Sequence, residues 1–335
     1  MEDIYRLLKP QFELPPPNYT GSVSEVYIGA TRDEKGTRRY CLRLGGERWL
    51  PFFSTTEPIV TKPILAMQVF DTPAGIPPEV CRILGDIVED PVHWCKVCVE
   101  GFKAEAVALT LTSTAPAGQD RSPEEAAKLV EQVIEAVDVP LIIIGSGDAG
   151  KDPLVLEKVA EATVGERCLI ASATLSSDYR RVAEAAIENG HVVLASTDCD
   201  PVSQRTLNMH LLSLGLKPSQ LVMDPTTAAL GYGLEYSISI IEQIRLNALK
   251  GDECLQMPIA AITSQSWTAR EALTDDLVLG PLSIRGPLWE VHTAVHLFLA
   301  GAELFIMLHP EAVVRFREVV ADMLLTGEPH PRTSD

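Results

Sequence analysis

The sequence lacks any apolar run of the roughly 18 to 20 residues that a membrane-spanning helix needs. Its first residues, Met1 to Arg6, also lack the basic segment and apolar core of a secretory signal peptide. Cysteine is sparse: the 7 cysteines form an odd, scattered set, which argues against a disulfide framework and for reduced thiols. We therefore expect a cytoplasmic protein.

Basic residues are also in short supply. Lys and Arg number 28 against 46 Asp and Glu, which gives a formal net charge of -18 spread over the whole length. This negative excess opposes docking to nucleic-acid phosphates or to anionic lipid. With 46% hydrophobic and 22% charged residues, the 335-residue chain can form one barrel-sized domain and an appendage. The expected partners are small ligands and proteins, with no nucleic acid and no membrane.

Two regions of the chain differ in pattern, 1–60 and 61–330. In the first, residues 23–30 and 39–44 alternate in polarity around a polar turn, which predicts a β-hairpin. The aromatic-rich segment 44–53 that follows is expected either to cover one end of the second region or to contact another chain. We predict an N-terminal extension with a hairpin, followed by one large domain.

From residue 63 onward, strand and helix patterns alternate regularly. The apolar, β-rich runs are 64–71, 106–114, 140–147, 168–173, 191–197, 220–224, 257–264 and 302–309. Crossover helices between them make neighbouring strands parallel, and eight such strands suggest a closed barrel. An open doubly wound sheet is the alternative, but it needs a Gly-rich loop where this chain has Phe70-Asp71-Thr72-Pro73. We predict a TIM (β/α)8 barrel with an N-terminal β-hairpin extension.

Several helix boundaries are marked by capping signals. Ser122-Pro123, Asp152-Pro153 and Asp200-Pro201 each place a cap residue ahead of a first-turn proline. Leu214-Gly215 and Lys250-Gly251 supply stops. These signals predict helices that begin at the three prolines.

In a parallel barrel the functional site forms from the loops after each strand. The residues there are small and polar: Asp71, Thr72, Thr112, Ser113, Thr114, Ser146, Gly147, Asp148, Ser172, Ser196, Thr197, Asp198, Asp224, Thr226, Thr227, Thr263, Ser264, Gln265 and His309. Such donors and acceptors suit the edges of a flat, amide-bearing or heterocyclic ligand. No serine with a paired histidine and acid emerges, and no paired acids or catalytic lysine favour a sugar- or phosphate-metabolising barrel.

The loop that begins at Asp224 is the most informative. Asp224 follows a buried apolar run, Thr226 and Thr227 add hydroxyls, and Gly231 and Gly233 permit close backbone approach to a ligand. The carboxylate either accepts hydrogen bonds from a bound heterocycle or caps its own loop through nearby N–H groups. The sequence leaves both roles open.

Three other motifs have structural explanations beside the functional ones. The loop Gly145-Ser146-Gly147-Asp148-Ala149-Gly150 could bind phosphate through backbone N–H groups or be a tight turn. Cys95-x-x-Cys98 lies in a predicted helix without a second pair, and we interpret it as two structural thiols. His292 and His296 have metal-ligand spacing but no acidic residue between them, which favours surface and core roles.

A cluster of aromatic and basic residues lies around the long insertion between the seventh and eighth strands. Trp267, Arg270 and Arg285 could stack on or pair with a ligand or a protein. The alternative is that Arg285-Gly286-Pro287 marks a helix start and that Trp289 is ordinary packing.

At these loops the chain resembles the small subunit of the corrinoid iron-sulfur protein, known in archaea as the delta subunit of acetyl-CoA decarbonylase/synthase. The resemblance covers nearly everything after residue 60. It is most specific in Met223-Asp224-Pro225-Thr226-Thr227-Ala228-Ala229-Leu230-Gly231-Tyr232-Gly233, in Gly165-Glu166-Arg167-Cys168-Leu169-Ile170-Ala171-Ser172-Ala173, in Trp267 with Ala269-Arg270-Glu271, and in Arg285-Gly286-Pro287-Leu288-Trp289-Glu290. Gly45-Gly46-Glu47 with Pro51-Phe52 resembles the N-terminal extension of the family.

The resemblance implies a TIM barrel that forms a heterodimer with a large subunit, which carries a [4Fe-4S] cluster and the main cobalamin-binding domain. The corrinoid would lie between the two chains. The complex would take a methyl group from methyltetrahydrofolate or an archaeal pterin through a methyltransferase and pass it to acetyl-CoA synthase in the Wood–Ljungdahl pathway. Whether this chain is itself catalytic stays open.

The resemblance also implies candidate cofactor-binding residues. They are Ser146, Gly147, Ser172, Thr197, Asp224, Thr226, Thr227 and His309 at the strand ends, with Trp267, Arg270 and Arg285 at the rim. We expect no protein nucleophile and no metal ligand among them, because the cobalt of the corrinoid does the chemistry. The alternative function is a pterin-dependent corrinoid methyltransferase on the same barrel, in which Asp224 would hold the pterin.

Overall fold

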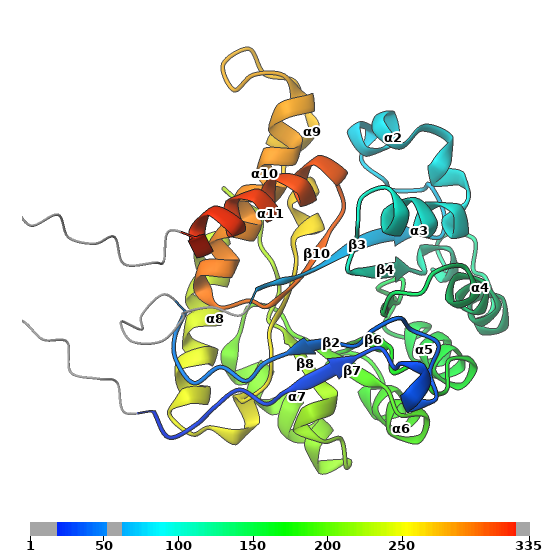
Figure 1. Ribbon diagram of the computed structural model, residues 1–335, viewed down its shortest axis with the longest axis vertical. Coiled ribbons are helices and arrows are strands. Elements are labelled where there is room, and N and C mark those ends of the chain that lie inside the picture. Colours follow the sequence, from blue (N-terminus) through cyan, green and yellow to red (C-terminus); the bar gives the residue numbers. More distant parts are fainter. Residues whose placement is uncertain (1–18, 52–61, 326–335) are drawn as a thin grey trace, which may run out of the picture.

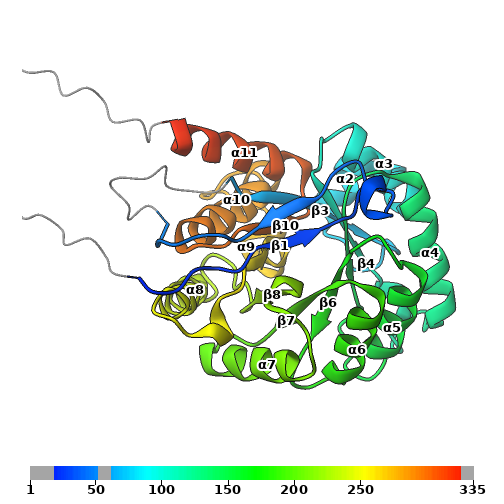
Figure 2. The same ribbon diagram turned by 60° about the horizontal axis from the view of Figure 1, so that its bottom comes forward.

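The computed structural model describes residues 19–51 and 62–325. In this part of the chain eight parallel strands form a ring surrounded by helices (Figures 1 and 2). The strands are β3 (Ile64–Phe70), β4 (Ala106–Thr110), β5 (Leu141–Ile144), β6 (Leu169–Ala173), β7 (Val192–Ser196), β8 (Leu221–Asp224), β9 (Ala260–Ile262) and β10 (Leu304–Met307). Their order in the sheet is β8-β7-β6-β5-β4-β3-β10-β9.

The ring closes between β8 and β9. Met223 and Ile259 form a parallel bridge there, and the Met223 amide donates to the Pro258 carbonyl oxygen at 2.8 Å. All neighbouring strands of the sheet are parallel, as crossover helices require. The predicted TIM barrel is confirmed, and each of the eight apolar runs contains one strand.

Helices form the outer layer of the barrel. They are α2 (Pro78–Leu84), α3 (Pro91–Glu100), α4 (Pro123–Ala136), α5 (Asp152–Ala162), α6 (Tyr179–Asn189), α7 (Pro201–Ser213), α8 (Leu234–Leu249), α9 (Arg270–Leu273), α10 (Leu282–Ala300) and α11 (Pro310–Leu325). Ser122 and Asp200 cap α4 and α7 through side-chain oxygens, as predicted, and α7 and α8 end just before their predicted stops.

Two predicted helix starts are wrong. Asp152 is the first residue of α5 rather than its cap, because its carboxylate accepts hydrogen bonds from the preceding β5 loop instead. Arg285-Gly286-Pro287 lies inside α10, which begins at Leu282. Gly286 has a packing role: a Cβ there would lie 2.6 Å from the ring of Trp267, so only glycine lets the two elements meet.

The predicted hairpin is confirmed as β1 (Val26–Ile28) paired antiparallel with β2 (Leu42–Leu44). Val26, Ile28 and Leu44 are buried in the same apolar cluster as the inward-facing residues of the barrel strands. The loops of the hairpin bond to residues that precede the strands, such as Gly29 N–H to Arg167 O at 2.8 Å. The extension therefore closes the N-terminal end of the barrel, and its apolar side chains pack into the barrel core.

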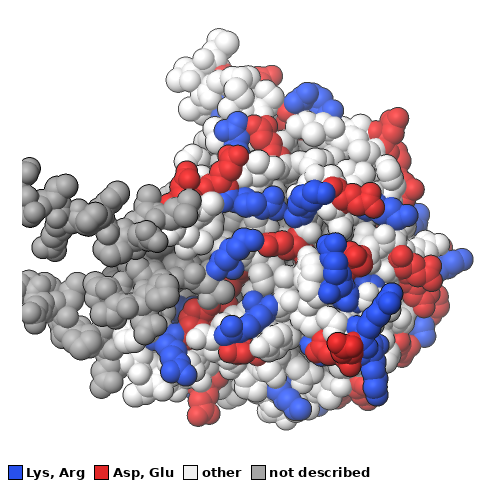
Figure 3. All heavy atoms as spheres, in the orientation of Figure 1, with Lys and Arg blue, Asp and Glu red and all other residues white. Residues whose placement is uncertain are grey.

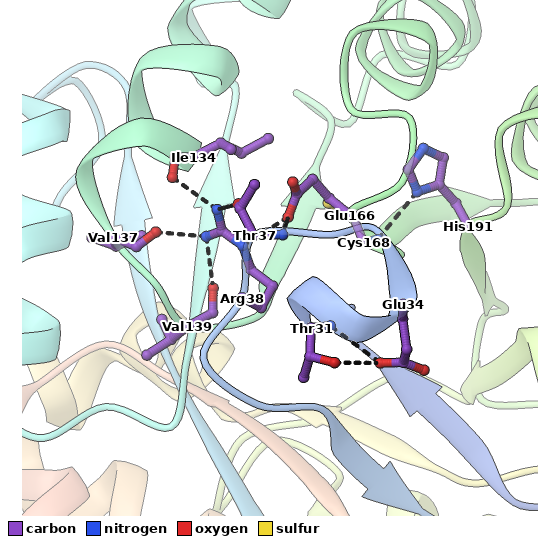
Figure 4. A network of polar contacts seen from close by, with 10 residues as sticks. All are labelled: Thr31, Glu34, Thr37, Arg38, Ile134, Val137, Val139, Glu166, Cys168 and His191. Atoms are coloured by element: carbon purple, nitrogen blue, oxygen red, sulfur yellow. Dashed lines mark hydrogen bonds and ion pairs between the residues drawn. The ribbon is translucent and has the colours of Figure 1, made fainter.

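Arg38 fixes this closure. It is 3% exposed, and its Nε donates to Glu166 Oε2 at 2.8 Å (Figure 4). Its Nη atoms donate to the carbonyl oxygens of Ile134, Val137 and Val139 at 2.8, 2.6 and 3.1 Å, at the C-terminal end of α4. A guanidinium suits that end, since the last carbonyls of a helix lack intrahelical donors and carry partial negative charge.

The hairpin and the barrel share one hydrophobic core, and the predicted boundary at residue 60 lies outside the described residues. So does the part of the aromatic-rich segment from Phe52 onward. Pro51 lies against Gly301, at the start of the loop before β10. No helix in residues 19–51 and 62–325 is long and apolar enough to cross a membrane.

Candidate functional site

A pocket of about 510 Å³ opens at the C-terminal end of the barrel. It is lined by Gln68, Phe70, Gly75, Pro77, Ile144, Gly145, Ser146, Gly147, Ala149, Asp152, Ala171, Ser172, Thr174, Ser176, Ser177, Ser196, Asp224, Ile262, Ser264, Gln265, Trp267, Thr268 and Leu308. The lining contains hydroxyls, amides and two carboxylates, but no Lys, Arg, His or Cys. On the face seen in Figure 3, basic side chains are interspersed with acidic ones on the outer surface rather than gathered in a patch.

Five of the eleven candidate residues line this pocket together: Ser146, Gly147, Ser172, Asp224 and Trp267. They come from the loops after β5 and β9 and from the C-terminal ends of β6 and β8, so the barrel gathers onto one mouth residues that are far apart in sequence. Thr197, Thr226, Thr227, Arg270, Arg285 and His309 lie outside the lining.

Asp224 ends β8 with only 3% of its surface exposed. Its Oδ2 accepts from Ser196 Oγ at 2.9 Å, and its Oδ1 accepts from the Thr226 amide at 3.1 Å. Burial raises the pKa of Asp224 to about 6, and the charge of nearby Asp198 adds to this, whereas the two hydrogen bonds oppose it. Asp224 thus makes the loop-capping bond and also faces the pocket.

Two of the three threonines outside the lining, Thr197 and Thr226, support the Asp224 loop. Thr226 has a left-handed backbone (φ 70°), and its hydroxyl donates to the Thr197 carbonyl oxygen. The Thr197 hydroxyl donates in turn to Gln204 Oε1 at 2.9 Å. Thr227 is 4% exposed. These bonds tie the β8 loop to the β7 loop and set the position of Asp224.

The glycine-rich loop after β5 already binds the carboxylate of Asp152. Asp152 Oδ1 accepts from the Ser146 amide at 2.8 Å and from Ser146 Oγ at 2.7 Å, and Asp152 Oδ2 accepts from the Gly147 amide at 2.8 Å. A Cβ at Gly145 would lie 2.4 Å from this carboxylate, so glycine is required there. The N–H groups that could have bound phosphate are therefore occupied by the chain itself.

Trp267 lines the pocket, and Glu290 and His309 hold its side chain in place. Its Nε1 donates to Glu290 Oε2 at 2.8 Å, and its ring stacks on His309 at 5.5 Å between centroids. Glu290 also accepts from the amides of Leu308 and His309, at 2.6 and 3.1 Å. Burial raises the pKa of Glu290 to about 7, against the effect of these three donors. Glu290 therefore joins α10 to the loops after β9 and β10.

His309 and the two rim arginines have supporting positions. His309 is fully buried, and its Nδ1 accepts from the Glu311 amide at 3.2 Å, which leaves the proton on Nε2. Burial lowers the pKa of His309 to about 4. Arg285 is 3% exposed and donates to the carbonyl oxygens of Glu271 and Gly280 at 2.5 and 2.9 Å. Arg270 is exposed on α9.

Gln68 is a buried polar residue of the pocket that was not among the candidates from the sequence, and Thr174, Ser176, Ser177 and Thr268 of the lining were not among them either. Gln68 is 6% exposed, lines the pocket and donates from Nε2 to Thr110 Oγ1 at 2.8 Å, while its Oε1 has no partner. The signal for it exists in the sequence, because Gln68 is the one polar residue in the strand Ile64–Phe70. Its position, alternating with the inward-facing Ile64 and Ala66, puts it inside the barrel.

The other motifs lie away from the pocket. Cys95 and Cys98 are fully buried in α3, in the layer between helices and barrel, and burial raises the pKa of Cys98 to about 12. His296 Nδ1 lies 2.7 Å from the carbonyl oxygen of His292. In the described part of the chain no three or more His, Cys, Asp or Glu side chains are grouped as metal ligands would be.

Comparison with known proteins identifies relatives along almost the whole chain. Residues 25–322 match the family model for the CO dehydrogenase/acetyl-CoA synthase delta subunit. The acetyl-CoA decarbonylase/synthase complex subunit delta of Methanothermobacter thermautotrophicus is 46% identical over 319 residues, which are 95% of this chain and 80% of the relative. The same subunit of Archaeoglobus fulgidus is 44% identical over 320 residues, 93% of this chain and 71% of the relative.

Among solved structures, dihydropteroate synthases share the fold. The enzyme of Xanthomonas albilineans superposes with a TM-score of 0.58 at 13% identity and covers 92% of this chain and 100% of its own. The enzyme of Thermus thermophilus has a TM-score of 0.54 at 16% identity, with 89% and 98% coverage. At such low identity these structures establish the barrel architecture alone.

Proposed function

The chain belongs to the CO dehydrogenase/acetyl-CoA synthase delta subunit family, and from its site we propose that it is the barrel subunit of a corrinoid-dependent methyl-transfer complex with little activity of its own. Its partner in this proposal is the large subunit of the corrinoid iron-sulfur protein, which carries the [4Fe-4S] cluster and the main cobalamin-binding domain. The complex takes methyl groups from methyltetrahydrofolate through a methyltransferase and delivers them to acetyl-CoA synthase, in the cytoplasm.

The observation that carries this proposal is the chemistry of the pocket lining. The periphery of a corrin bears uncharged carboxamides, which need hydrogen-bond donors and acceptors rather than charges. The lining supplies serine and threonine hydroxyls, the Gln68 and Gln265 amides and the Asp224 carboxylate, without a cation. These residues fit the edge of such a macrocycle.

The corrinoid supplies the cobalt that accepts and releases the methyl group. The chain's own residues bind and orient its edge: in this proposal Ser146, Gly147, Ser172, Asp224 and Trp267 contact it. Thr197, Thr226, Thr227, Arg285 and His309 hold the loops that present those contacts, and Arg270 faces the partner protein.

Asp152 and Asp224 are the ionisable groups of the lining, and Asp152 already accepts three bonds from the β5 loop. Both oxygens of Asp224 already accept a bond from the protein, one from Ser196 and one from Thr226. Each oxygen keeps one further lone pair, so a bidentate pterin would need both of these at a carboxylate that is only 3% exposed. This arrangement favours the subunit over a pterin-dependent methyltransferase enzyme.

Co-expression with the large subunit tests the proposal. We expect a heterodimer that retains cobalamin through gel filtration, with cobalt measured against protein, while this chain alone retains none. Methyltetrahydrofolate and free cobalamin are added to the chain alone as the second assay. Rapid methylation of cobalamin by the chain alone would replace the subunit proposal with the enzyme.

A further inference from the structure

One buried amide in the pocket lacks a hydrogen-bond partner within residues 19–51 and 62–325. Gln68 Oε1 is inaccessible to solvent and unpaired, although Gln68 Nε2 is fixed by Thr110 Oγ1 at 2.8 Å. A buried acceptor without a donor costs about 1–3 kcal/mol. Such groups are rare in folded proteins, and one that lines a pocket points to a ligand that completes it.

Position within the barrel explains why the protein leaves this group free. Along β3 the inward residues are Ile64, Ala66 and then Gln68, so the amide caps the apolar interior and forms the pocket floor. β8 contributes Val222 and then Asp224 in the same way. In the sheet order β3 and β8 are separated by β10 and β9 on one side and by four strands on the other. Two acceptors thus face the pocket from well-separated strands of the ring.

The charges of the lining limit the chemical class of ligand that these acceptors can bind. Anionic groups are repelled, because Asp152 and Asp224 are the charged residues of the lining and no cation balances them. The N–H groups of Ser146 and Gly147 are already bonded to Asp152 and cannot serve an anion. A cation is poorly served as well, since both carboxylates already accept bonds from the protein, three at Asp152 and two at Asp224. Each Asp224 oxygen keeps a second lone pair, which suits a single uncharged N–H donor.

We propose that the pocket floor is a subsite for an uncharged amide-type N–H group of the ligand, accepted by Gln68 on β3 and Asp224 on β8. The inference rests on the proposed function for its source, which is a side-chain carboxamide of the corrin. The lactam and amino edge of a pterin carries the same chemistry, and the experiment distinguishes the two sources.

The test compares the full-length chain with its Gln68→Leu variant, each co-expressed with the large subunit. Leucine keeps the volume and removes the acceptor. Cobalamin affinity of each complex is measured by titration and by cobalt content after gel filtration. We expect binding about tenfold weaker in the variant, equivalent to ~1.4 kcal/mol. The melting temperature should stay close to the wild type, because removal of the unpaired Oε1 offsets the loss of the bond from Nε2 to Thr110 Oγ1.

Gln220→Leu is the matched control. Gln220 is a glutamine that directly precedes β8, at the closed end of the barrel and outside the pocket lining, and its Nε2 donates to the His191 carbonyl oxygen at 3.1 Å. Its replacement should lower the melting temperature while leaving the cobalamin affinity of the folded complex unchanged. The two variants thus show opposite patterns of stability and binding.

A second arm titrates methyltetrahydrofolate into the same proteins. If the wild-type complex binds cobalamin and Gln68→Leu binds it equally well, the corrin subsite is overturned while the proposed function stands. If the wild-type complex retains no cobalamin, the proposed function fails, and the subsite is judged by the pterin alone. Weaker pterin binding in Gln68→Leu then supports the subsite with a pterin source, and equal or absent pterin binding overturns it.

Discussion

The barrel is closed by the chain itself at its N-terminal end and left open at its C-terminal end. At the closed end the hairpin residues Val26, Ile28 and Leu44 enter the barrel core, and Arg38 is paired with Glu166 and with three carbonyl oxygens in and just after the last turn of α4. The polar groups of the Arg38 network satisfy one another. This end is a stability element, and its residues have no reason to meet a ligand.

Among the residues that the structure describes, several buried polar atoms at the open end have no partner. They include Gln68 Oε1, Ser266 Oγ, Arg285 Nη2 and His309 Nε2. Trp94 Nε1 in α3 is also unpaired, and Arg245 Nη1 is the corresponding atom near the closed end. The inward residues change accordingly along a strand: in β7 they run from Val192 and Leu194 to Ser196. In parallel barrels function gathers at the C-terminal ends of the strands, and here unsatisfied polarity gathers there too.

The largest expected effect tests the closed end. Arg38→Met leaves Glu166 buried without its cation and several carbonyl oxygens without a donor. We expect a loss of about 3–5 kcal/mol in the free energy of unfolding, because breaking a buried pair leaves an uncompensated charge. Urea denaturation measures it. Cobalamin retention by the folded complex should be unchanged.

Arg39→Met is the matched control for Arg38→Met. The neighbouring Arg39 has a side chain that is 59% exposed, and its Nε lies 3.7 Å from Asp138 Oδ2. Exposed pairs of this kind contribute little. Equal losses in the two variants would show that the closed end does not depend on the buried network.

The second-largest effect tests the Asp152 carboxylate, which occupies the N–H groups of the β5 loop at the open end. Asp152→Ala removes the acceptor of the Ser146 and Gly147 amides and should cost on the order of 2–3 kcal/mol, the range for hydrogen bonds to a charged group. The freed N–H groups should then bind sulfate. A thermal shift with millimolar sulfate, at ionic strength matched by chloride, should be larger in Asp152→Ala than in the wild type.

Asp200→Ala controls the stability measurement. Asp200 accepts from the Val202 and Ser203 amides at the start of α7, at 3.1 and 2.9 Å, on the surface. Its loss should be smaller than that of Asp152→Ala, because the cap is exposed to water. A sulfate response no larger in Asp152→Ala than in the wild type would remove the anion-nest explanation of the β5 loop.

The same comparison explains which features the sequence could predict. Strands, the closed ring and the caps at Ser122 and Asp200 depend on local signals, apolar runs and cap residues before proline, and were predicted correctly. Asp152-Pro153 carries the identical signal but was misjudged, because its carboxylate turns back to a loop whose position depends on the fold. Periodicity and capping rules are blind to such tertiary competition.

The sequence predicted where the site residues lie better than it predicted which groups they contact. The rule that function follows the strand ends placed Asp224, Ser146 and Ser172 at one mouth, whereas Thr226 and Arg285 proved to be bonded to neighbouring loops. Gln68 was missed because it lies within a strand rather than after it. The available signal was a polar residue at an inward position of an apolar strand. To use it, one must know which residues of β3 point into the barrel.

A moderate effect is expected at the wall of the pocket. Trp267→Phe keeps a ring against His309 and removes the N–H that Glu290 accepts, so it should cost about 1–2 kcal/mol of unfolding free energy and also weaken cobalamin retention. Trp289→Phe is its control. Trp289 Nε1 donates to the Leu230 carbonyl oxygen at 3.0 Å, outside the pocket lining. A similar loss of cobalamin in both variants would assign Trp267 a purely structural role.

The smallest effect has the opposite sign and concerns Asp224. Burial raises the pKa of this carboxyl from an ordinary value near 3.8 to about 6, so the folded state holds its proton more tightly than the unfolded state. The wild type therefore loses stability as pH rises from about 4 to about 6 and does not recover it above pH 6. Asp224→Asn lacks this titration, and its amide can still bond to Ser196 and Thr226.

We expect Asp224→Asn to be more stable than the wild type by about 1 kcal/mol at pH 8, because it buries no charge, with the difference shrinking toward pH 4. Urea titrations of both proteins at pH 8, 6 and 4.5 measure it. A carboxylate that lowers the stability of its own fold is kept for what it binds, so the stabilised variant should retain less cobalamin. If Asp224→Asn is destabilised at every pH, Asp224 belongs with the closed end as a structural group, and the contrast between the two ends fails at its central residue.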